Sequence, residues 1–508
     1  MPGPPPRTSG APAVAEVVRE RGEMRFERRM SDAEALMWNV ERDPWLNPNG
    51  GMICVLDRPA DIEQFRRRMR WAVAKIPRLR QHVVPGLGRL SPPLWASDPE
   101  FDFDYHVRHL RLPPPGSMHQ LYELATRFYE DPFDRTRPLW VFVMIDGLEG
   151  DRSALFSKLH HSITDGKGFV RLSELYMERD ADAPLPPEVD LDDVIALAVA
   201  EEEAEDKAPG GDLAAGFVDV AGRTLSHAWR RQAGIARRTA GEMALWSADP
   251  VRIKDVGEEA VESLRSLVSQ VGGGGEVPGG SPLWVKRSRR RHLESLQLSL
   301  DDVRAAGKLL GGTVNDVFVV GAVNGALLYH ARRDCPVEAL NLSFVVSTRT
   351  DAGAGGNAFT PTRLQVSGQD MGAAERFALV RDRMAERREG VRGEGALNGL
   401  AGLANLLPTS VVTRVARSQA AHMDFATSNI RAAPFPLHIA GAQMLYNACM
   451  GPVAGTAFNL TTVSYNGSLD IGAFVDPAAV EDPDDLRDCL ETAYSDLLEA
   501  GGVLRSRR

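Results

Sequence analysis

The chain has 508 residues, of which 43% are apolar and 25% are charged, and its formal net charge at pH 7 is −10. This composition is typical of a globular protein with room for two domains and sizeable cores. The acidic balance disfavours general nucleic-acid binding, because no basic excess is available to neutralise phosphates. No run of about eighteen or more apolar residues occurs, so the sequence predicts no membrane-spanning segment.

The N-terminal tail and the cysteines indicate the cellular setting. Residues 1–23 are rich in Pro, Ala and charge and lack the apolar core of a signal peptide, so they are predicted to form a disordered tail. Four cysteines are scattered singly along the chain: Cys54, Cys335, Cys449 and Cys489. This spacing does not fit the usual zinc sites, and it favours reduced thiols in a cytoplasmic protein without a metal centre.

A first unit is predicted over residues 24–177. It combines a helical pattern at Ile62–Ile76 with short apolar runs at Trp140–Ile145 and Ala154–Leu159, which are typical of buried strands. The second of these runs leads directly into His-His-Ser-Ile-Thr-Asp-Gly at 160–166. The sequence therefore places this heptapeptide at the end of a strand, beside a turn.

The heptapeptide carries the clearest chemical signal in the chain. An imidazole held at a strand end beside a cleft can take a proton from a hydroxyl, because its pKa lies near neutrality. Asp165 is too close in sequence to orient His161 in the usual way, so it is predicted to pair with a distant Arg and pin the turn. Gly166 allows the backbone to turn sharply. His160 either supports the site by hydrogen bonding or only fills the core.

Residues 178–291 differ in composition and are predicted to form a helical linker. They include an acidic run at Glu201–Asp206 and four consecutive glycines at 272–275. On a helical wheel, residues 217–240 place an apolar face opposite five arginines: Arg223, Arg230, Arg231, Arg237 and Arg238. Such a helix either lies in a lipid interface with its arginines near anionic head groups or packs between two domains.

A second unit is predicted over residues 292–508. Ser299 has the spacing of a helix cap, and Gly311 is placed to end the same helix. Alternating apolar residues at Ala457–Tyr465 and Ser468–Val475, separated by Asn-Gly, predict a hairpin with a type I′ turn. Because strands and helices mix in both units, the predicted fold is α/β, with two sandwich domains built on mixed sheets.

Asn315 and Asp316 open a further predicted helix. Thr313 and Asp316 have the spacing of a capping box, so Asp316 can serve only the first-turn amides and the helix dipole. Asn315 is then the better candidate for contact with substrate, because a first-turn amide can donate to a developing oxyanion.

Several segments together resemble the bacterial wax ester synthase/diacylglycerol acyltransferase family, within the CoA-dependent acyltransferase superfamily. The matching segments, in chain order, are Asp102–His109, Arg137-Pro138-Leu139-Trp140, the heptapeptide 160–166, Thr313–Val317, Gly356-Asn357 and Ser428-Asn429. The resemblance covers about residues 25–500. One departure follows Ser428-Asn429, where a Pro-Gly-Pro-like turn is usual in the family and this chain has Ile430-Arg431-Ala432-Ala433-Pro434.

The resemblance implies a fold and a reaction. It implies two chloramphenicol acetyltransferase-like domains meeting at a tunnel, with His161 as the general base that deprotonates an acceptor hydroxyl. Arg80 is the implied partner of Asp165. Pro138, Leu139 and Trp140 form the family motif, and Trp140 is predicted to belong to the core rather than to the substrate wall.

The implied substrates are acyl-CoA and either diacylglycerol or a long-chain alcohol. No metal or redox cofactor is expected, because acyl-CoA brings its own leaving group. The implied setting is the cytoplasm, with peripheral attachment to a membrane or lipid-droplet surface, and no nucleic-acid partner is expected. No Gly-x-Ser-x-Gly elbow occurs and no cysteine lies near the heptapeptide, so a covalent acyl-enzyme is not expected.

Two other functions stay open at this point. One is a condensation-type acyltransferase that uses a carrier-bound thioester. The other is a catalytically silent protein that coats lipid droplets. The Pro-Leu-Trp and Asn-Asp segments disfavour the first, and the intact heptapeptide disfavours the second.

Overall fold

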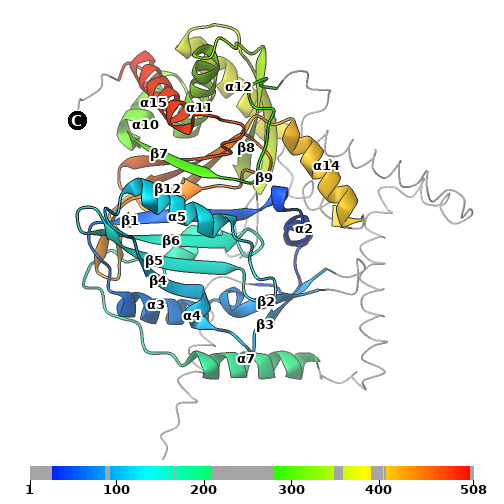
Figure 1. The fold of residues 1–508 in the computed structure, drawn as a ribbon, viewed down its shortest axis with the longest axis vertical. Coiled ribbons are helices and arrows are strands. Elements are labelled where there is room, and N and C mark those ends of the chain that lie inside the picture. The colour runs from blue at the N-terminus through cyan, green and yellow to red at the C-terminus, as the bar shows by residue number, and fades with distance from the viewer. Residues whose placement is uncertain are drawn as a thin grey trace, which may run out of the picture.

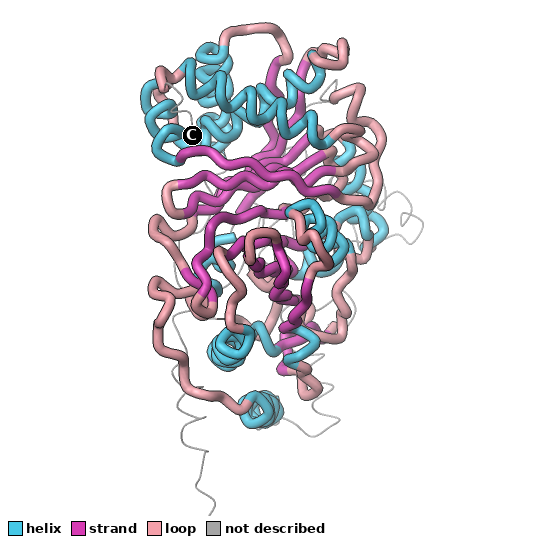
Figure 2. Tube along the Cα trace, turned by 60° about the vertical axis from the view of Figure 1, so that its left-hand side comes forward, coloured by secondary structure: helices cyan, strands magenta, loops and turns pink. Residues whose placement is uncertain are grey.

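The computed structural model describes residues 26–85, 92–164, 166–206, 280–347, 359–390, 404–405 and 408–503. In these residues two six-stranded mixed sheets form the centres of two α/β units, and a two-stranded sheet accompanies the first. Figure 1 shows the first sheet in the lower half, with α3 and α7 at the bottom, and the helices α10, α11, α12 and α15 at the top. The tube in Figure 2 shows the same arrangement from another side, with strands between the outer helices.

The first sheet is antiparallel except where β4 pairs with β5. Its strands in spatial order are β11 (His438–Ile439), β12 (Ala442–Met450), β1 (Asn49–Leu56), β6 (Arg152–His160), β5 (Trp140–Leu148) and β4 (Val107–Arg111). The small sheet pairs β2 (Gln81–Val84) with β3 (Leu94–Ser97). Both apolar runs that the sequence predicted to be strands are therefore strands, β5 and β6.

Successive side chains of these strands point to opposite faces of the first sheet, and apolar residues are present on both faces. One face packs against α3, whose Phe65 and Met69 are fully buried, and the other packs against α5, through Leu121 and Ala125. The helix predicted at Ile62–Ile76 is observed as Ile62–Lys75: the Asp61 side chain caps its first amides, and Ile76 is extended because a proline follows it. The helices of this unit are α2 (Asp32–Val40), η1 (Pro44–Leu46), α3 (Ile62–Lys75), η2 (Pro77–Arg80), α4 (Phe103–His106), α5 (Met118–Glu130), α6 (Gly166–Ser173) and α7 (Leu191–Asp206).

The second sheet mixes parallel and antiparallel pairs, because β10 lies parallel to both of its neighbours. Its order is β7 (His292–Ser299), β14 (Ser468–Val475), β13 (Phe458–Tyr465), β10 (Phe425–Arg431), β8 (Ala339–Ser347) and β9 (Phe359–Ser367). The predicted hairpin is confirmed: β13 and β14 pair in register, and Asn466 and Gly467 have φ values of 42° and 81°. Positive φ at both turn residues is what a type I′ turn requires.

Helices cover the outer face of the second sheet. They are α10 (Leu300–Leu309), α11 (Val314–Ala331), α12 (Ala373–Gly390) and α15 (Pro483–Ala500), while α14 (Thr409–Ala421) packs elsewhere, against α2. The predicted local signals are observed here. Ser299 caps α10, Gly311 follows that helix with φ 76°, and Thr313 and Asp316 form a complete capping box.

The two units are interlocked. Strand β12, from the second half of the sequence, pairs with β1 and so extends the first sheet. Helix α7, from the predicted linker, packs against β3 and α3. The predicted unit boundaries at 177/178 and 291/292 stay predictions, and the amphipathic stretch at 217–240 lies outside the described residues.

Within the described ranges, no single helix has both the length and the apolar character needed to cross a membrane. Helices α10 and α11 pass this test only as a pair, and their axes are bent by 91° at the break between them.

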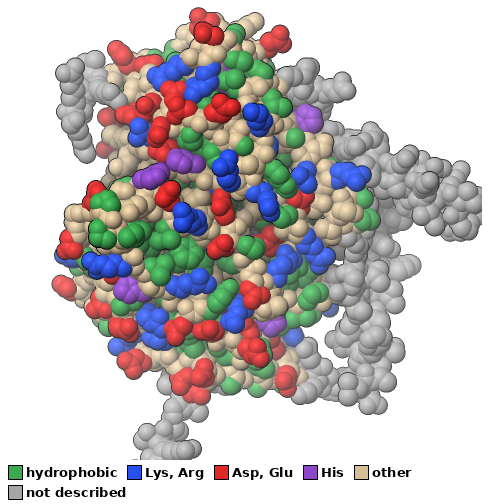
Figure 3. All heavy atoms as spheres, viewed as in Figure 1, with side chains coloured by type: hydrophobic (Ala, Val, Ile, Leu, Met, Phe, Trp, Pro, Cys, Tyr) green, Lys and Arg blue, Asp and Glu red, His purple; other side chains and the backbone are tan. Residues whose placement is uncertain are grey.

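The surface seen in Figure 3 mixes basic and acidic side chains. Lys and Arg alternate with Asp and Glu over the drawn part of this face. The drawn part of this face therefore presents no extended basic field of the kind that binds phosphate backbones.

Candidate active site

The His pair lies at the junction of β6 and β1. His160 is the last residue of β6 and is paired in register with Asn49, the first residue of β1. The His161 amide donates to the Pro48 carbonyl at 3.3 Å. A Cβ atom built on Gly50 would lie 3.6 Å from His161 Nε2, so the imidazole lies close over the start of β1. The His161 side chain is half-buried, as a base that must meet a substrate requires.

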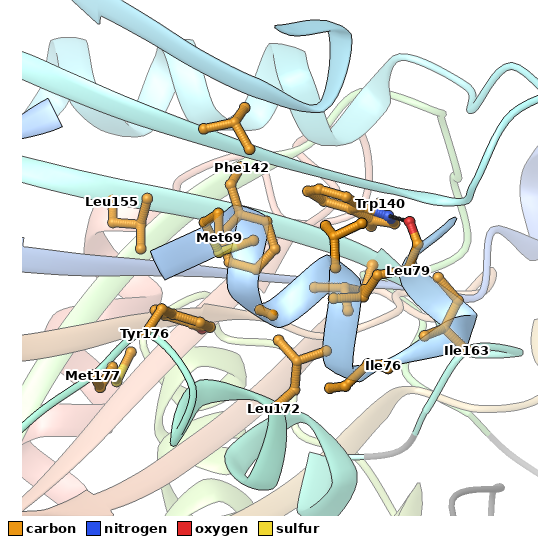
Figure 4. Packing of buried hydrophobic residues seen from close by; sticks show 14 of the residues in the cluster. Met69, Ile76, Leu79, Trp140, Phe142, Leu155, Ile163, Leu172, Tyr176 and Met177 are labelled. Carbon is orange, nitrogen blue, oxygen red and sulfur yellow. Dashed lines mark hydrogen bonds between the residues drawn. The ribbon is translucent and has the colours of Figure 1, made fainter. Parts of the chain in front are cut away.

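The turn after the pair is anchored in the core. Ile163 is 2% exposed, packs with Ile76 and Leu79, and donates its amide to the His160 carbonyl at 2.9 Å. Figure 4 shows Ile163 beside Leu79 and Ile76 at the edge of this cluster. The apolar residue inside the heptapeptide therefore holds the turn in place.

His160 is a fully buried hydrogen-bonding residue. Its Nδ1 lies 2.6 Å from Ser162 Oγ and accepts from the Ser162 amide at 3.0 Å. Burial, together with the neighbouring His161, lowers the pKa of His160 well below its usual value, so this ring is neutral. Of the two alternatives for His160, the contacts favour support of the site by hydrogen bonding.

Asp165 lies outside the described residues. Its implied partner Arg80 is 4% exposed and donates to the carbonyls of Val73 and Ala74 at 2.7 and 2.9 Å. The predicted Asp165–Arg80 pair stays a prediction.

Gly166 begins α6 and touches the second unit. A Cβ atom at this position would lie 3.0 Å from Ile430 Cδ1, in β10. Any larger residue would therefore push the turn away from β10, so the glycine permits close contact between the two units as well as a turn.

Asn429 of β10 and Asn315 of α11 are joined by a hydrogen bond. Asn429 Nδ2 donates to Asn315 Oδ1 at 3.1 Å, and Asn429 precedes the Ile430 that packs on Gly166. With Oδ1 occupied, the Nδ2 group is the donor that Asn315 can offer to a substrate. The structure thus joins three sequence segments from two halves of the chain: the turn after His161, Ser428-Asn429 and the start of α11.

Asp316 caps the start of helix α11. It is 3% exposed, accepts from the amide and hydroxyl of Thr313 at 2.9 and 2.8 Å, and lies 3.3 Å from Arg388 Nη2. Both carboxylate oxygens are therefore engaged by groups of the protein. These contacts favour the capping alternative for Asp316.

Replacement of Asn315 by Ala is expected to lower kcat by about 10²-fold, the usual effect of removing one oxyanion donor. The KM for acyl-CoA should change little, because the donor would act mainly in the transition state. Steady-state kinetics at saturating acceptor measures both constants. Asn324→Ala, within the same helix, is the matched control. An unchanged kcat for Asn315→Ala would remove this residue from the site.

The Pro-Leu-Trp segment belongs to the core. Leu139 and Trp140 are both 0% exposed. Trp140 Nε1 donates to the Leu79 carbonyl at 2.7 Å, and its ring stacks on His106 at 4.5 Å between centroids. Figure 4 shows this hydrogen bond and the packing of Trp140 near Phe142. The prediction that Trp140 is a core residue is confirmed.

Two charged residues beside the His pair were not predicted from the sequence. Lys158 is 2% exposed on β6, two residues before His160, and its ammonium donates to the carbonyls of Phe128 and Asp131 at the end of α5. Glu41, just after α2, has a side chain that is 11% exposed and lies 3.5 Å from His160 Nε2. The position of Lys158 inside an apolar strand was the one sequence feature that could have pointed to it. No sequence feature pointed to Glu41.

Burial lowers the pKa of Lys158 to about 8. The folded pKa lies below the unfolded value, so the unfolded state binds more protons above about pH 8 and stability should rise with pH there. Between about pH 7.5 and about pH 9 the gain should be about 1 kcal/mol. Urea unfolding at both pH values measures it, with Lys158→Met as the reference that lacks this contribution. If the free energies of unfolding of wild type and Lys158→Met differed by the same amount at both pH values, the lowered pKa of Lys158 would be contradicted.

The sequence of this chain is similar to proteins of a known family. Residues 30–318 match the family described as wax ester synthase/diacylglycerol acyltransferase catalytic domain, and residues 355–498 match the WS/DGAT C-terminal domain. A protein of Mycobacterium tuberculosis H37Rv, named as a diacylglycerol O-acyltransferase, is 26% identical over 498 residues, which are 95% of this chain and 94% of that protein. The M. tuberculosis diacylglycerol O-acyltransferase tgs2 is 26% identical over 458 residues, covering 88% and 92%.

Solved structures confirm the predicted fold class. The wax ester synthase/diacylglycerol acyltransferase from Marinobacter aquaeolei VT8 superposes with a TM-score of 0.61 at 18% identity, over 93% of this chain and 100% of its own. The first condensation domain of the calcium-dependent antibiotic synthetase superposes with a TM-score of 0.54 at 16% identity, over 94% and 97%. The first family match alone spans more than half of the chain. The chain therefore belongs to the wax ester synthase/diacylglycerol acyltransferase family and is an acyl-CoA-dependent acyltransferase.

Proposed function

We propose that this acyltransferase moves a long-chain acyl group from acyl-CoA to diacylglycerol or to a fatty alcohol, with His161 as the general base. The observation that carries the proposal is the meeting of the two halves of the chain beside the His pair. The turn after His161 packs on Ile430, and the adjacent Asn429 bonds Asn315. A base from one unit and an amide donor from the other can thus serve one reaction centre.

The reaction needs only groups of this chain and its substrates. The acceptor hydroxyl oxygen attacks the thioester carbonyl while His161 takes its proton. Asn315 Nδ2 donates to the resulting oxyanion. When the C–S bond breaks, the CoA sulfur leaves with the electron pair and takes the proton from His161. The products are an ester and free CoA, and no protein group is acylated.

Diacylglycerol is the favoured acceptor. Both M. tuberculosis relatives are named as diacylglycerol O-acyltransferases, while the M. aquaeolei protein is named for both activities. Purified protein incubated with labelled palmitoyl-CoA and diacylglycerol should form triacylglycerol. Hexadecanol in its place tests wax ester synthesis, and an arm without acceptor measures hydrolysis. Absence of product in both acceptor arms would overturn the proposal and leave a silent lipid-binding protein.

A carrier-bound thioester is the second candidate donor. The condensation-domain superposition favours it, since those domains belong to peptide synthetases. Presenting the same palmitoyl group on a carrier protein instead of CoA separates the two donors. Faster turnover with the carrier-bound group would make the protein a condensation-type acyltransferase.

We also propose peripheral attachment to an anionic lipid surface, supported by the sequence pattern of residues 217–240. The protein should float with anionic vesicles at low salt and be released at high salt, because each basic residue near such a surface contributes about 1 kcal/mol that salt screens. A variant with Gln in place of the five arginines at 223, 230, 231, 237 and 238 should no longer float. It should keep its activity on a detergent-dispersed acceptor. Salt-insensitive binding, or full binding by the variant, would favour a strut between the domains.

A further inference from the structure

A cluster of polar side chains contacts the buried ring of His160. Glu41 Oε2 lies 3.5 Å from His160 Nε2, and the same oxygen accepts from Arg135 Nη1 at 2.8 Å. Arg135 is itself held in place, because its Nη2 donates to the Trp38 carbonyl at 3.0 Å and its guanidinium lies 3.2 Å from the Trp38 ring centroid. The Glu41 carboxylate is therefore fixed at a defined point beside the ring.

The contacts of His160 determine which ring nitrogen carries the proton. The Ser162 amide can only donate, so His160 Nδ1 must be an acceptor without a proton. The proton of the neutral ring is then on Nε2, which has no hydrogen-bond partner among the described residues and lies 3.5 Å from Glu41 Oε2. The His160 ring thus lies between the Glu41 carboxylate and the backbone amide of Ser162, from which it accepts a hydrogen bond.

This arrangement holds the peptide that carries His161. The amide before the His161 side chain is bound to the Pro48 carbonyl, and the amide after it is bound to His160 Nδ1. We propose that Glu41 is a positioning residue for acyl transfer: its carboxylate, 3.5 Å away, attracts the otherwise unpartnered Nε2–H of His160, orients that ring, and so fixes the backbone on the C-terminal side of the base. This inference rests on the proposed function of His161.

The catalytic rate is sensitive to small displacements of the His161 ring. A base must lie within hydrogen-bond reach of the acceptor hydroxyl, and a shift of about 1 Å can cost about 10²-fold in rate. Among the described residues, Glu41 is hydrogen-bonded to Arg135 and lies beside His160, and both of these belong to the first unit. Loss of Glu41 should therefore change kcat and leave acyl-CoA binding unchanged.

Three variants of Glu41 and Arg135 test the assignment. Glu41→Leu should lower kcat about 10- to 100-fold, with the KM for acyl-CoA within about twofold of wild type. Glu41→Gln keeps an acceptor oxygen at the same reach and should recover most of the lost kcat. Arg135→Met leaves the Glu41 carboxylate without the group that holds it, so it should lower kcat in the same direction as Glu41→Leu, by a smaller factor, and should also reduce the melting temperature. Glu123→Gln, on the exposed side of α5, is the control for charge.

A variant of His160 keeps the test informative if Glu41→Leu folds poorly. His160→Leu removes the same contact in the core and should reproduce the loss in kcat. Because Glu41 is proposed to act only through the His160 ring, the double variant with Glu41→Leu should lose no more than the worse single variant. Multiplied losses, or a Glu41→Leu protein with wild-type kcat, would overturn the inference.

His161→Ala separates this inference from the proposed function. An inactive His161→Ala protein beside a fully active Glu41→Leu protein would overturn only the positioning role of Glu41. An active His161→Ala protein would overturn the base assignment and the inference with it.

Discussion

Replacement of His161 by Ala is expected to lower kcat by about 10²- to 10⁴-fold, the usual contribution of a general base. The side chain is half-buried at the end of β6, and the turn that carries it is anchored by Ile163 and by backbone hydrogen bonds. The fold should therefore survive the change. Acyl transfer from labelled acyl-CoA to diacylglycerol measures the rate, and the melting temperature reports the fold.

The matched control is His119→Ala, at a His on α5 whose side chain is 68% exposed. It should keep the wild-type rate. A His161→Ala protein that retains more than about half of the wild-type rate would falsify the base assignment.

Replacement of Trp140 by Ala is expected to cost about 3 to 5 kcal/mol in the free energy of unfolding, the range for loss of a large aromatic side chain from a core. The residue is fully buried, stacks on His106 and donates to the Leu79 carbonyl, which would lose its partner. Urea unfolding measures the change. A substrate-wall residue would behave differently, with a raised KM for acyl-CoA and little loss of stability.

Trp71→Ala is the comparison for this effect. Trp71 is a half-buried residue of α3, with Lys75 over its ring. Its loss removes less packing and should cost clearly less than the loss of Trp140. Equal costs at the two positions would contradict the central place of Trp140 in the core.

The elements that were predictable from sequence depend on neighbours along the chain. The hairpin at Asn466-Gly467, the cap at Ser299 and the box at Thr313 each join residues that lie within a few positions of one another. Local hydrogen bonds and backbone preferences decide such features before any distant segment arrives. The heptapeptide at 160–166 is local in the same sense, so its strand-end position could be read directly.

The side-chain contacts within the site join residues that are far apart in the sequence. Asn429 and Asn315 are 114 positions apart, and Glu41, which follows helix α2, lies beside His160 at the end of β6. The core role of Trp140 depends likewise on the Leu79 carbonyl, 61 positions away. Sequence patterns narrow the residue types at such places, while the choice of partner follows from how helices and sheets pack in three dimensions. The same holds for β12, whose apolar pattern suits any buried sheet and whose place beside β1 is settled only by tertiary packing.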